Sequence, residues 1–291
     1  MPHQCPTNDE GKTRGWPVFP SSLVGHWWGI RHLLCLLVLP FAFAPTLSSQ
    51  EKKPPEKKDA PKLLYAVPLI AKPGEKQKLA LRGKNLAAVK EVKVAGADGA
   101  KVKVLGAKAV GVPNNYPGER VGDSEVEIEL ELPKNAKPGE VKLTAVGPGG
   151  DSSAYTLLLR DELSAVAEKE ENGGFDTAQP VTVPCAIEGT IKGERDVDVF
   201  KFDGKKGDNL TVELQAKRFG SPVEGFLTVF DADRKIIASA DEAKGSPDPV
   251  LLVTLPRDGT YFVTLIDAND LGGANFGYRL VVRKENAKKA K

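Results

Sequence analysis

The chain has 291 residues with 41 basic and 39 acidic side chains, so its formal net charge is only +2. All three histidines, all three tryptophans and two of the three cysteines lie within the first 35 residues: His3, His26, His32, Trp16, Trp27, Trp28, Cys5 and Cys35. Beyond residue 49 the composition therefore excludes a Ser-His-Asp triad, a Cys-His pair, and zinc sites built from histidine or several cysteines.

Residues 1–49 are typical of an export signal. Arg31 and His32 precede the apolar run Leu33–Leu39, and the small-residue tract Ala42-Phe43-Ala44 follows it. The run is shorter than the roughly 20 apolar residues that cross a bilayer. We therefore expect an exported protein, periplasmic, cell-surface or extracellular, with no membrane span after signal cleavage. An uncleaved membrane anchor is the alternative.

Charge is unevenly distributed over the rest of the chain. Residues 50–62 form a Lys- and Pro-rich linker, and residues 283–291 form a basic tail. The segment 164–282 holds 20 acidic against 13 basic residues. Because phosphate binding needs a clustered basic face, this acidic body disfavours nucleic acid as a partner.

Residues 63–160 are predicted to be all-β. In Glu125–Leu132, acidic and aliphatic residues alternate strictly, as expected for a strand with one buried and one solvated face. The row of glutamates has two interpretations, a cation site or a solvated edge strand, and we favour the edge strand. Val141–Val146 and Tyr155–Leu159 flank the turn-forming stretch Gly147–Gly150, which predicts a hairpin.

Short motifs in this segment resemble a known module. Pro73-Gly74, Leu79–Leu86 and Lys137–Glu140 are similar to the immunoglobulin-like IPT/TIG fold. The resemblance implies a β-sandwich over residues 63–160. The segment contains only three aromatic residues, all tyrosines, so it has little material for stacking on bases or sugars.

Residues 164–282 contain short β-type runs separated by turns rich in Gly, Asp, Asn and Pro. The runs are Val181–Ile187, Val197–Phe202, Leu210–Leu214, Phe226–Phe230, Lys235–Ser239, Val250–Thr254, Tyr261–Ile266 and Tyr278–Val282. This spacing predicts an antiparallel sandwich, with Cys185 as a buried, inert thiol. The fold class expected for the whole chain is all-β: two antiparallel β-sandwich domains in tandem, after a signal peptide and a charged linker.

One group of polar residues could carry chemistry. Glu168, Glu170 and Asn172 stand at alternate positions, so in an extended segment they share a face, as do Asp196 and Asp198. Calcium takes six to eight oxygen ligands, and carboxylates with an amide oxygen suit it. These two sets of oxygen donors are therefore candidate calcium ligands. The alternative is that they are solvated loop residues.

Three motifs in this half occur in the order found in a known family. Glu168–Asn172, Gly193–Phe202 and Asp258–Val263 resemble the bacterial pre-peptidase C-terminal domain and, similarly, the collagen-binding domains of collagenases. The resemblance implies a β-sandwich accessory domain that is not a catalyst, with calcium held at the five residues above. Gly173 is a departure, because those relatives often have another aspartate there.

The predicted function is therefore non-catalytic. We expect a binding or scaffolding protein of the cell envelope or extracellular space, whose partner is an extracellular protein or polysaccharide. The alternative is an accessory or targeting subunit of a secreted protease or other hydrolase encoded separately. A glycoside hydrolase with paired carboxylates is disfavoured, because a short-looped sandwich without tryptophan offers little cleft for a sugar.

Overall fold

The computed structural model describes residues 59–112 and 118–285. The predicted signal peptide, most of the linker before residue 62, and residues 286–291 of the predicted tail lie outside the described residues. Strands dominate the described chain, which confirms the all-β class. Within the described ranges there is no helix long and apolar enough to cross a membrane.

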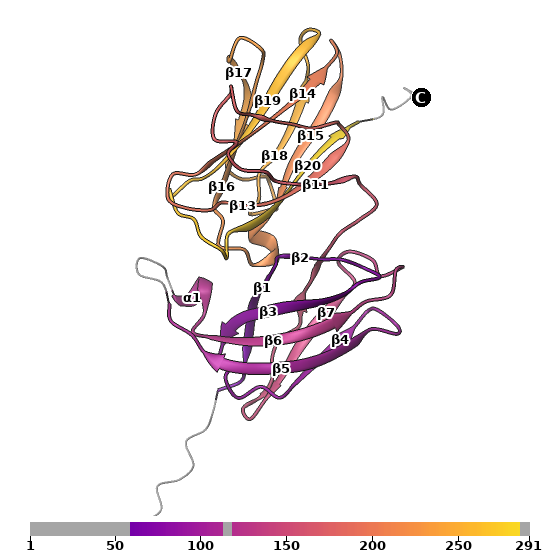
Figure 1. Ribbon diagram of the computed structural model, residues 1–291, viewed down its shortest axis with the longest axis vertical. Helices are drawn as coiled ribbons and strands as arrows, with labels where there is room; N and C mark the ends of the chain where they lie inside the picture. The colour runs from indigo at the N-terminus through magenta and orange to yellow at the C-terminus, as the bar shows by residue number, and fades with distance from the viewer. Residues whose placement is uncertain (1–58, 113–117, 286–291) are drawn as a thin grey trace, which may run out of the picture. The chain divides into compact units, whose positions relative to one another are not determined.

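The first half of the described chain contains two main sheets (Figure 1). One sheet has the order β1-β3-β6-β5 and is antiparallel throughout: β1 (Lys62–Val67), β3 (Lys76–Lys84), β6 (Ser124–Glu131) and β5 (Lys101–Ala109). The other contains β4 (Glu91–Ala95), β7 (Lys142–Gly147), β8 (Gly150–Asp151) and β9 (Tyr155–Thr156). A parallel pair, β2 (Ile70–Ala71) with β10 (Leu158–Leu159), and the one-turn helix α1 (Gly118–Val121) complete this half.

Strand β6 has the predicted alternation but lies at the centre of its sheet. Val126, Ile128 and Leu130 are fully buried. The expectation of a solvated edge strand is wrong, because β3 and β5 pair with the two sides of β6. The glutamates on its outer face instead form ion pairs with lysines of both neighbours: Lys76–Glu129 at 2.9 Å, Lys108–Glu125 at 3.2 Å, Lys101–Glu131 at 3.6 Å and Lys78–Glu127 at 3.7 Å.

The predicted hairpin forms with one modification. Strand β7 pairs with β9 through Leu143 and Tyr155, and the two-residue strand β8 is inserted between them. The chain then leaves this sheet, because Leu158 and Leu159 pair in parallel with Ile70 and Ala71.

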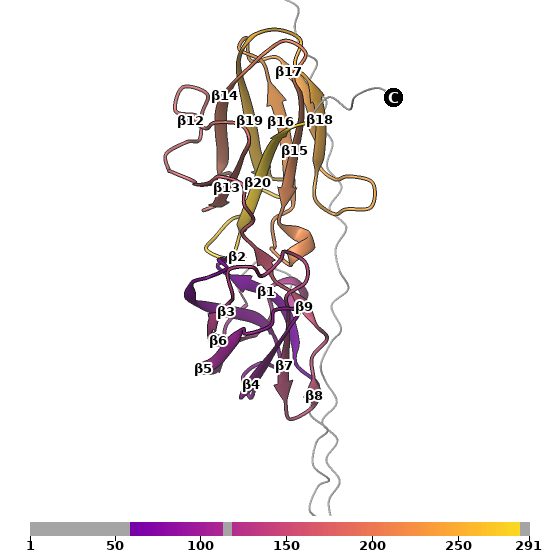
Figure 2. The ribbon, with the colours of Figure 1, turned by 90° about the vertical axis from the view of Figure 1, so that its right-hand side faces the viewer.

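The second half is a sandwich of two five-stranded sheets (Figures 1 and 2). One sheet has the order β11 (Ala165–Ala167), β13 (Cys185–Thr190), β20 (Gly277–Lys284), β15 (Asn209–Gln215) and β18 (Val250–Thr254). The other has the order β12 (Gln179–Pro180), β14 (Val197–Gly204), β19 (Gly259–Asp267), β16 (Gly225–Phe230) and β17 (Ile236–Ala240). All pairs are antiparallel except β11 with β13 and β12 with β14. A single 3₁₀ turn covers Lys217–Phe219.

Each half has its own hydrophobic core. One core draws its residues from between Leu63 and Leu159, and the other from between Cys185 and Val282. The second core includes Cys185, which is fully buried as predicted, and burial raises the pKa of its thiol to about 11. Strand β20 continues to Lys284, so the sheet includes the first residues of the predicted basic tail.

Candidate metal centre

The candidate site begins where β11 ends. Glu168 follows β11 directly, and its backbone N–H donates to the Glu188 carbonyl at 3.0 Å, which extends the parallel pairing with β13 by one residue. The Gln179 side chain holds the next turn of the chain: its amide donates to Ala167 O at 3.0 Å and its oxygen accepts from Lys169 N at 2.8 Å. These bonds position the segment 168–172 beside the sandwich.

The third acid comes from the opposite sheet. Asp198 lies on β14 two residues before Phe200 and four before Phe202, which are both in the core, so its carboxylate shares their inner face of the strand. The backbone carbonyl of Asn172 accepts from Val199 N at 3.2 Å, which ties the segment 168–172 to β14. Residues from both sheets therefore meet at one end of the core.

Three carboxylates converge there. Oxygens of Glu168, Glu170 and Asp198 all lie within 4.8 Å of one another. Glu168 is oriented by Thr190 N, which donates to its Oε2 at 2.7 Å. Asp198 is fully buried, Glu168 is half-buried, and the Glu170 carboxylate is nearest to solvent. Such a concentration of negative charge beside a buried position is costly unless a cation or a proton compensates it.

Several buried oxygens at this point have no hydrogen-bond partner. Within the described residues, both carboxylate oxygens of Asp198 and the amide oxygen of Asn172 are buried and unpaired. The Asn172 Nδ2 donates to Glu168 Oε1 at 3.4 Å, which leaves its Oδ1 available for another ligand. Buried polar atoms are nearly always satisfied in proteins, and these oxygens lie beside clustered carboxylates, so a bound cation would give them a partner.

Burial and the neighbouring acids change the pKa values of Asp198 and Tyr278. Burial, with the neighbouring Glu168 carboxylate as the next cause, raises the pKa of Asp198 to about 9. Burial and the charges of the same two acids raise the pKa of Tyr278 well above its usual value. Without a metal, Asp198 therefore takes up a proton at neutral pH, whereas a bound cation would favour its ionised form.

The donor set fits a hard divalent cation. Glu168, Glu170, Asn172 and Asp198 offer only oxygen, which suits calcium, and the group contains no sulfur or imidazole for a softer metal. The structure thus brings together four of the five predicted residues. Asp196 lies outside the group of three carboxylates, because its Oδ2 accepts from Lys192 N at 2.6 Å in the turn before β14.

Two residues that the sequence did not single out complete the site. Tyr278 on β20 is fully buried, and its hydroxyl interacts with the carboxyl groups of Asp198 and Glu168. A Cβ on Gly189 would stand 2.5 Å from that hydroxyl and would also clash with Glu168 Oε2. A glycine in the middle of a strand is the local signal, since it marks a close approach by other groups.

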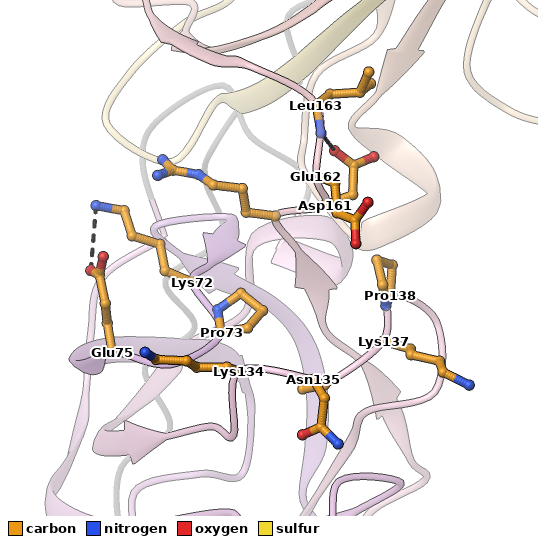
Figure 3. A pocket seen from close by; sticks show the side chains of 12 residues that line it. Lys72, Pro73, Glu75, Lys134, Asn135, Lys137, Pro138, Asp161, Glu162 and Leu163 are labelled. Atoms are coloured by element: carbon orange, nitrogen blue, oxygen red, sulfur yellow. Dashed lines mark hydrogen bonds and ion pairs between the residues drawn. The ribbon is translucent and has the colours of Figure 1, made fainter.

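Elsewhere the described chain has a cavity that is separate from the carboxylate cluster. Its volume is about 940 Å³, and its lining includes Lys72, Glu75, Lys134, Asp161 and Glu162 (Figure 3). Two of its three acids have partners: Glu75 lies 3.8 Å from Lys72 Nζ, and Asp161 accepts from Leu163 N at 3.0 Å. Asp161 also accepts from the Arg279 guanidinium. A pair of free carboxylates facing across a cleft, as glycoside hydrolysis needs, is not found here.

Comparison with known protein families gives a match within the second sandwich. Residues 196–266 match the family model of the bacterial pre-peptidase C-terminal domain. The chain is 37% identical over 117 residues to a probable subtilase-type serine protease of Deinococcus radiodurans. The aligned region covers 39% of this chain and 16% of the protease. The chain thus matches only a small part of that relative's length.

Two solved structures are similar to part of the chain. The pre-peptidase C-terminal domain of a Bacillus anthracis collagenase is 14% identical, with a TM-score of 0.29, over 36% of this chain and 94% of that one. PliG, a periplasmic lysozyme inhibitor of Aeromonas hydrophila, is 17% identical, with a TM-score of 0.28, over 43% and 100%. From the family match, residues 196–266, which run from the turn before β14 to the last residue but one of β19, belong to a bacterial pre-peptidase C-terminal domain.

Proposed function

We propose that this chain is an exported, non-catalytic binding or scaffolding protein whose second sandwich is stabilised by calcium. Glu168, Glu170, Asn172 and Asp198 would hold the ion. The observation that carries the proposal is the set of buried, unpaired oxygens on Asn172 and Asp198 beside two further carboxylates. A bound divalent cation would neutralise those charges and join the segment after β11 to β14.

The non-catalytic part rests on composition and on the domain type. From residue 50 onward the sequence has no histidine, and its single cysteine is buried with a raised pKa. The domain matched by residues 196–266 occurs as an accessory part of secreted proteases, which supports export and a supporting role. An extracellular protein or polysaccharide is the partner we propose.

A second candidate function is favoured by the similarity to the subtilase-type protease. In this alternative the chain is an accessory or targeting subunit of a secreted protease or other hydrolase supplied by a separate polypeptide. Both candidates use the same sandwich and the same metal site, and they differ in the partner.

Thermal unfolding of the purified chain tests the calcium site. A ligand that binds only the native state stabilises it by about 2.7 kcal/mol at a hundredfold excess over Kd, so millimolar calcium should raise the midpoint by several degrees. Magnesium should do much less, because it demands tighter octahedral geometry. Asp198→Asn should abolish the calcium shift while leaving the metal-free midpoint nearly unchanged, since asparagine resembles the protonated acid in shape.

Glu170→Gln is the companion variant, and it should likewise reduce the shift. An identical wild-type midpoint in calcium and in chelator would show that these acids hold no ion.

A further inference from the structure

One basic side chain already occupies the edge of the carboxylate cluster. Lys192 Nζ lies 3.3 Å from Glu170 Oε1. Within the described ranges no other ion pair reaches Glu168, Glu170 or Asp198. The Lys192 side chain is 66% exposed and that of Glu170 only 24%, so the ammonium approaches the cluster from solvent.

The backbone of Lys192 has a separate task. Its N–H donates to Asp196 Oδ2 at 2.6 Å, in the turn where Asp196 N donates to Gly193 O at 3.4 Å. The main chain therefore orients the turn before β14, and the side chain is free to leave without disturbing it. A substitution at position 192 can remove the ammonium and keep the backbone donor.

We propose that Lys192 is a built-in competitor of calcium that sets the affinity of the site. The proposal rests on the proposed calcium-binding function. In the metal-free protein the ammonium compensates part of the charge on Glu170, and it has to withdraw when the ion binds. A partly exposed ion pair is weak, so this exchange is feasible, and its cost appears directly as lower calcium affinity.

Two physical effects act in the same direction. Calcium must compete for the Glu170 oxygen that pairs with the ammonium. It also meets repulsion from a unit positive charge a few ångströms away, and this repulsion falls with distance and with salt. Lysine suits such a role because its ammonium is a compact charge on a flexible stem.

Isothermal titration of calcium chloride into the purified full-length chain tests the proposal. Lys192→Met should bind calcium about three- to tenfold more tightly than the wild type, as expected for removing a partly exposed competing charge. Lys192→Arg keeps the charge, so its Kd should stay at or above the wild-type value.

Lys235→Met is the matched control for the lost charge. Lys235 follows β16 in the turn to β17, beyond Phe230, which pairs with Phe262, whereas Asp198 pairs with Leu265. Its removal changes net charge equally but far from the site, so Kd should not change.

The outcomes separate this inference from the function on which it rests. If the wild type binds calcium and Lys192→Met has the same Kd as Lys235→Met, the competitor role is wrong and the calcium site stands. If the wild type takes up no calcium, the proposed site itself fails. Metal-free melting midpoints of the three variants close to that of the wild type would exclude a general loss of structure as the cause of any change.

Discussion

Position 189 has to be small because two side chains from distant parts of the sequence meet over it. Glu168 arrives from the end of β11 and Tyr278 from β20, and both occupy the space that a Cβ on Gly189 would need. The glycine thereby allows a carboxylate and a phenol to lie side by side at the end of the core. Its role is steric, since its backbone is not in the left-handed region.

Gly189→Ala should destabilise the chain by about 1–3 kcal/mol, the range expected when a methyl group is forced into a filled space. It should also weaken calcium binding by displacing Glu168. Urea unfolding, with and without calcium, measures both effects.

Gly193→Ala is the matched control, because a Cβ there meets no atom within 4 Å and its backbone is compatible with alanine. Equal stability of the two variants would contradict the steric account.

Part of the site could be predicted from the sequence and part could not. Alternation alone places Glu168, Glu170 and Asn172 on one side of an extended segment, and places Asp198 with the core phenylalanines of its strand. Tyr278 reaches the site only through the long-range pairing of β13 with β20, for which no local pattern exists. Asp196 stands two residues before Asp198, so alternation predicts the same face for both. A hydrogen bond in the turn before β14 instead holds the Asp196 carboxylate away from the cluster, and residue spacing cannot predict that bond.

At the scale of elements, the sheet around β6 shows how the charges of one strand depend on its neighbours. The glutamates of β6 face lysines on β3 and β5, so its outer surface is neutralised by cross-strand pairs. The sequence contains the signal for this arrangement, because Lys76 and Lys78, like Lys101 and Lys103, alternate with uncharged residues. The glutamates of β6 alone suggest an edge strand. The alternating lysines of two other strands indicate that β6 lies between them.

Glu129→Lys should lower the urea midpoint, because Lys78 and Lys103 stand directly opposite position 129 and Lys76 pairs with it. Glu129→Gln, the neutral control, should have a smaller effect. High salt should narrow the difference between the two variants, since exposed charges are screened. The same loss in low and in high salt would show that the charge is not responsible.

This pairing also has a pH dependence. The hydrogen bond from Lys76, with the positive charge of that lysine, holds the pKa of Glu129 below its usual 4.5. The stabilisation from the Lys76–Glu129 pair is therefore fully present above pH 4.5, and it is lost as pH falls through the lowered pKa of Glu129 in the folded chain.

At the scale of the whole molecule, a few specific hydrogen bonds connect the two halves of the described chain. The Tyr155 hydroxyl donates to Phe219 O at 2.9 Å and accepts from Ala66 N at 3.2 Å. The Arg160 guanidinium pairs with Glu188, the residue whose carbonyl accepts from Glu168 N. The first sandwich is thus connected to the strand that borders the candidate site.

Affinity capture distinguishes the two candidate functions. The full-length chain, immobilised in millimolar calcium, should retain an extracellular protein or polysaccharide from culture and envelope extracts. Retention should fall in chelator, because loss of the ion loosens the sandwich. Co-elution of a secreted hydrolase, detected by its activity, would favour the accessory-subunit alternative. Retention no greater than on an albumin-coupled control would argue against both.

The position of Asp198 on the inner face of β14 also bears on the order of events during folding. The strands of the second core can assemble around Phe200 and Phe202 before the segment after β11 docks, but docking brings like charges together. We therefore expect closure of that end to be a late step, reached after most apolar surface is already buried. Interactions that form after the transition state change the unfolding rate rather than the folding rate. Calcium would thus slow the unfolding of the second sandwich, and so lengthen its folded lifetime, while leaving its folding rate almost unchanged.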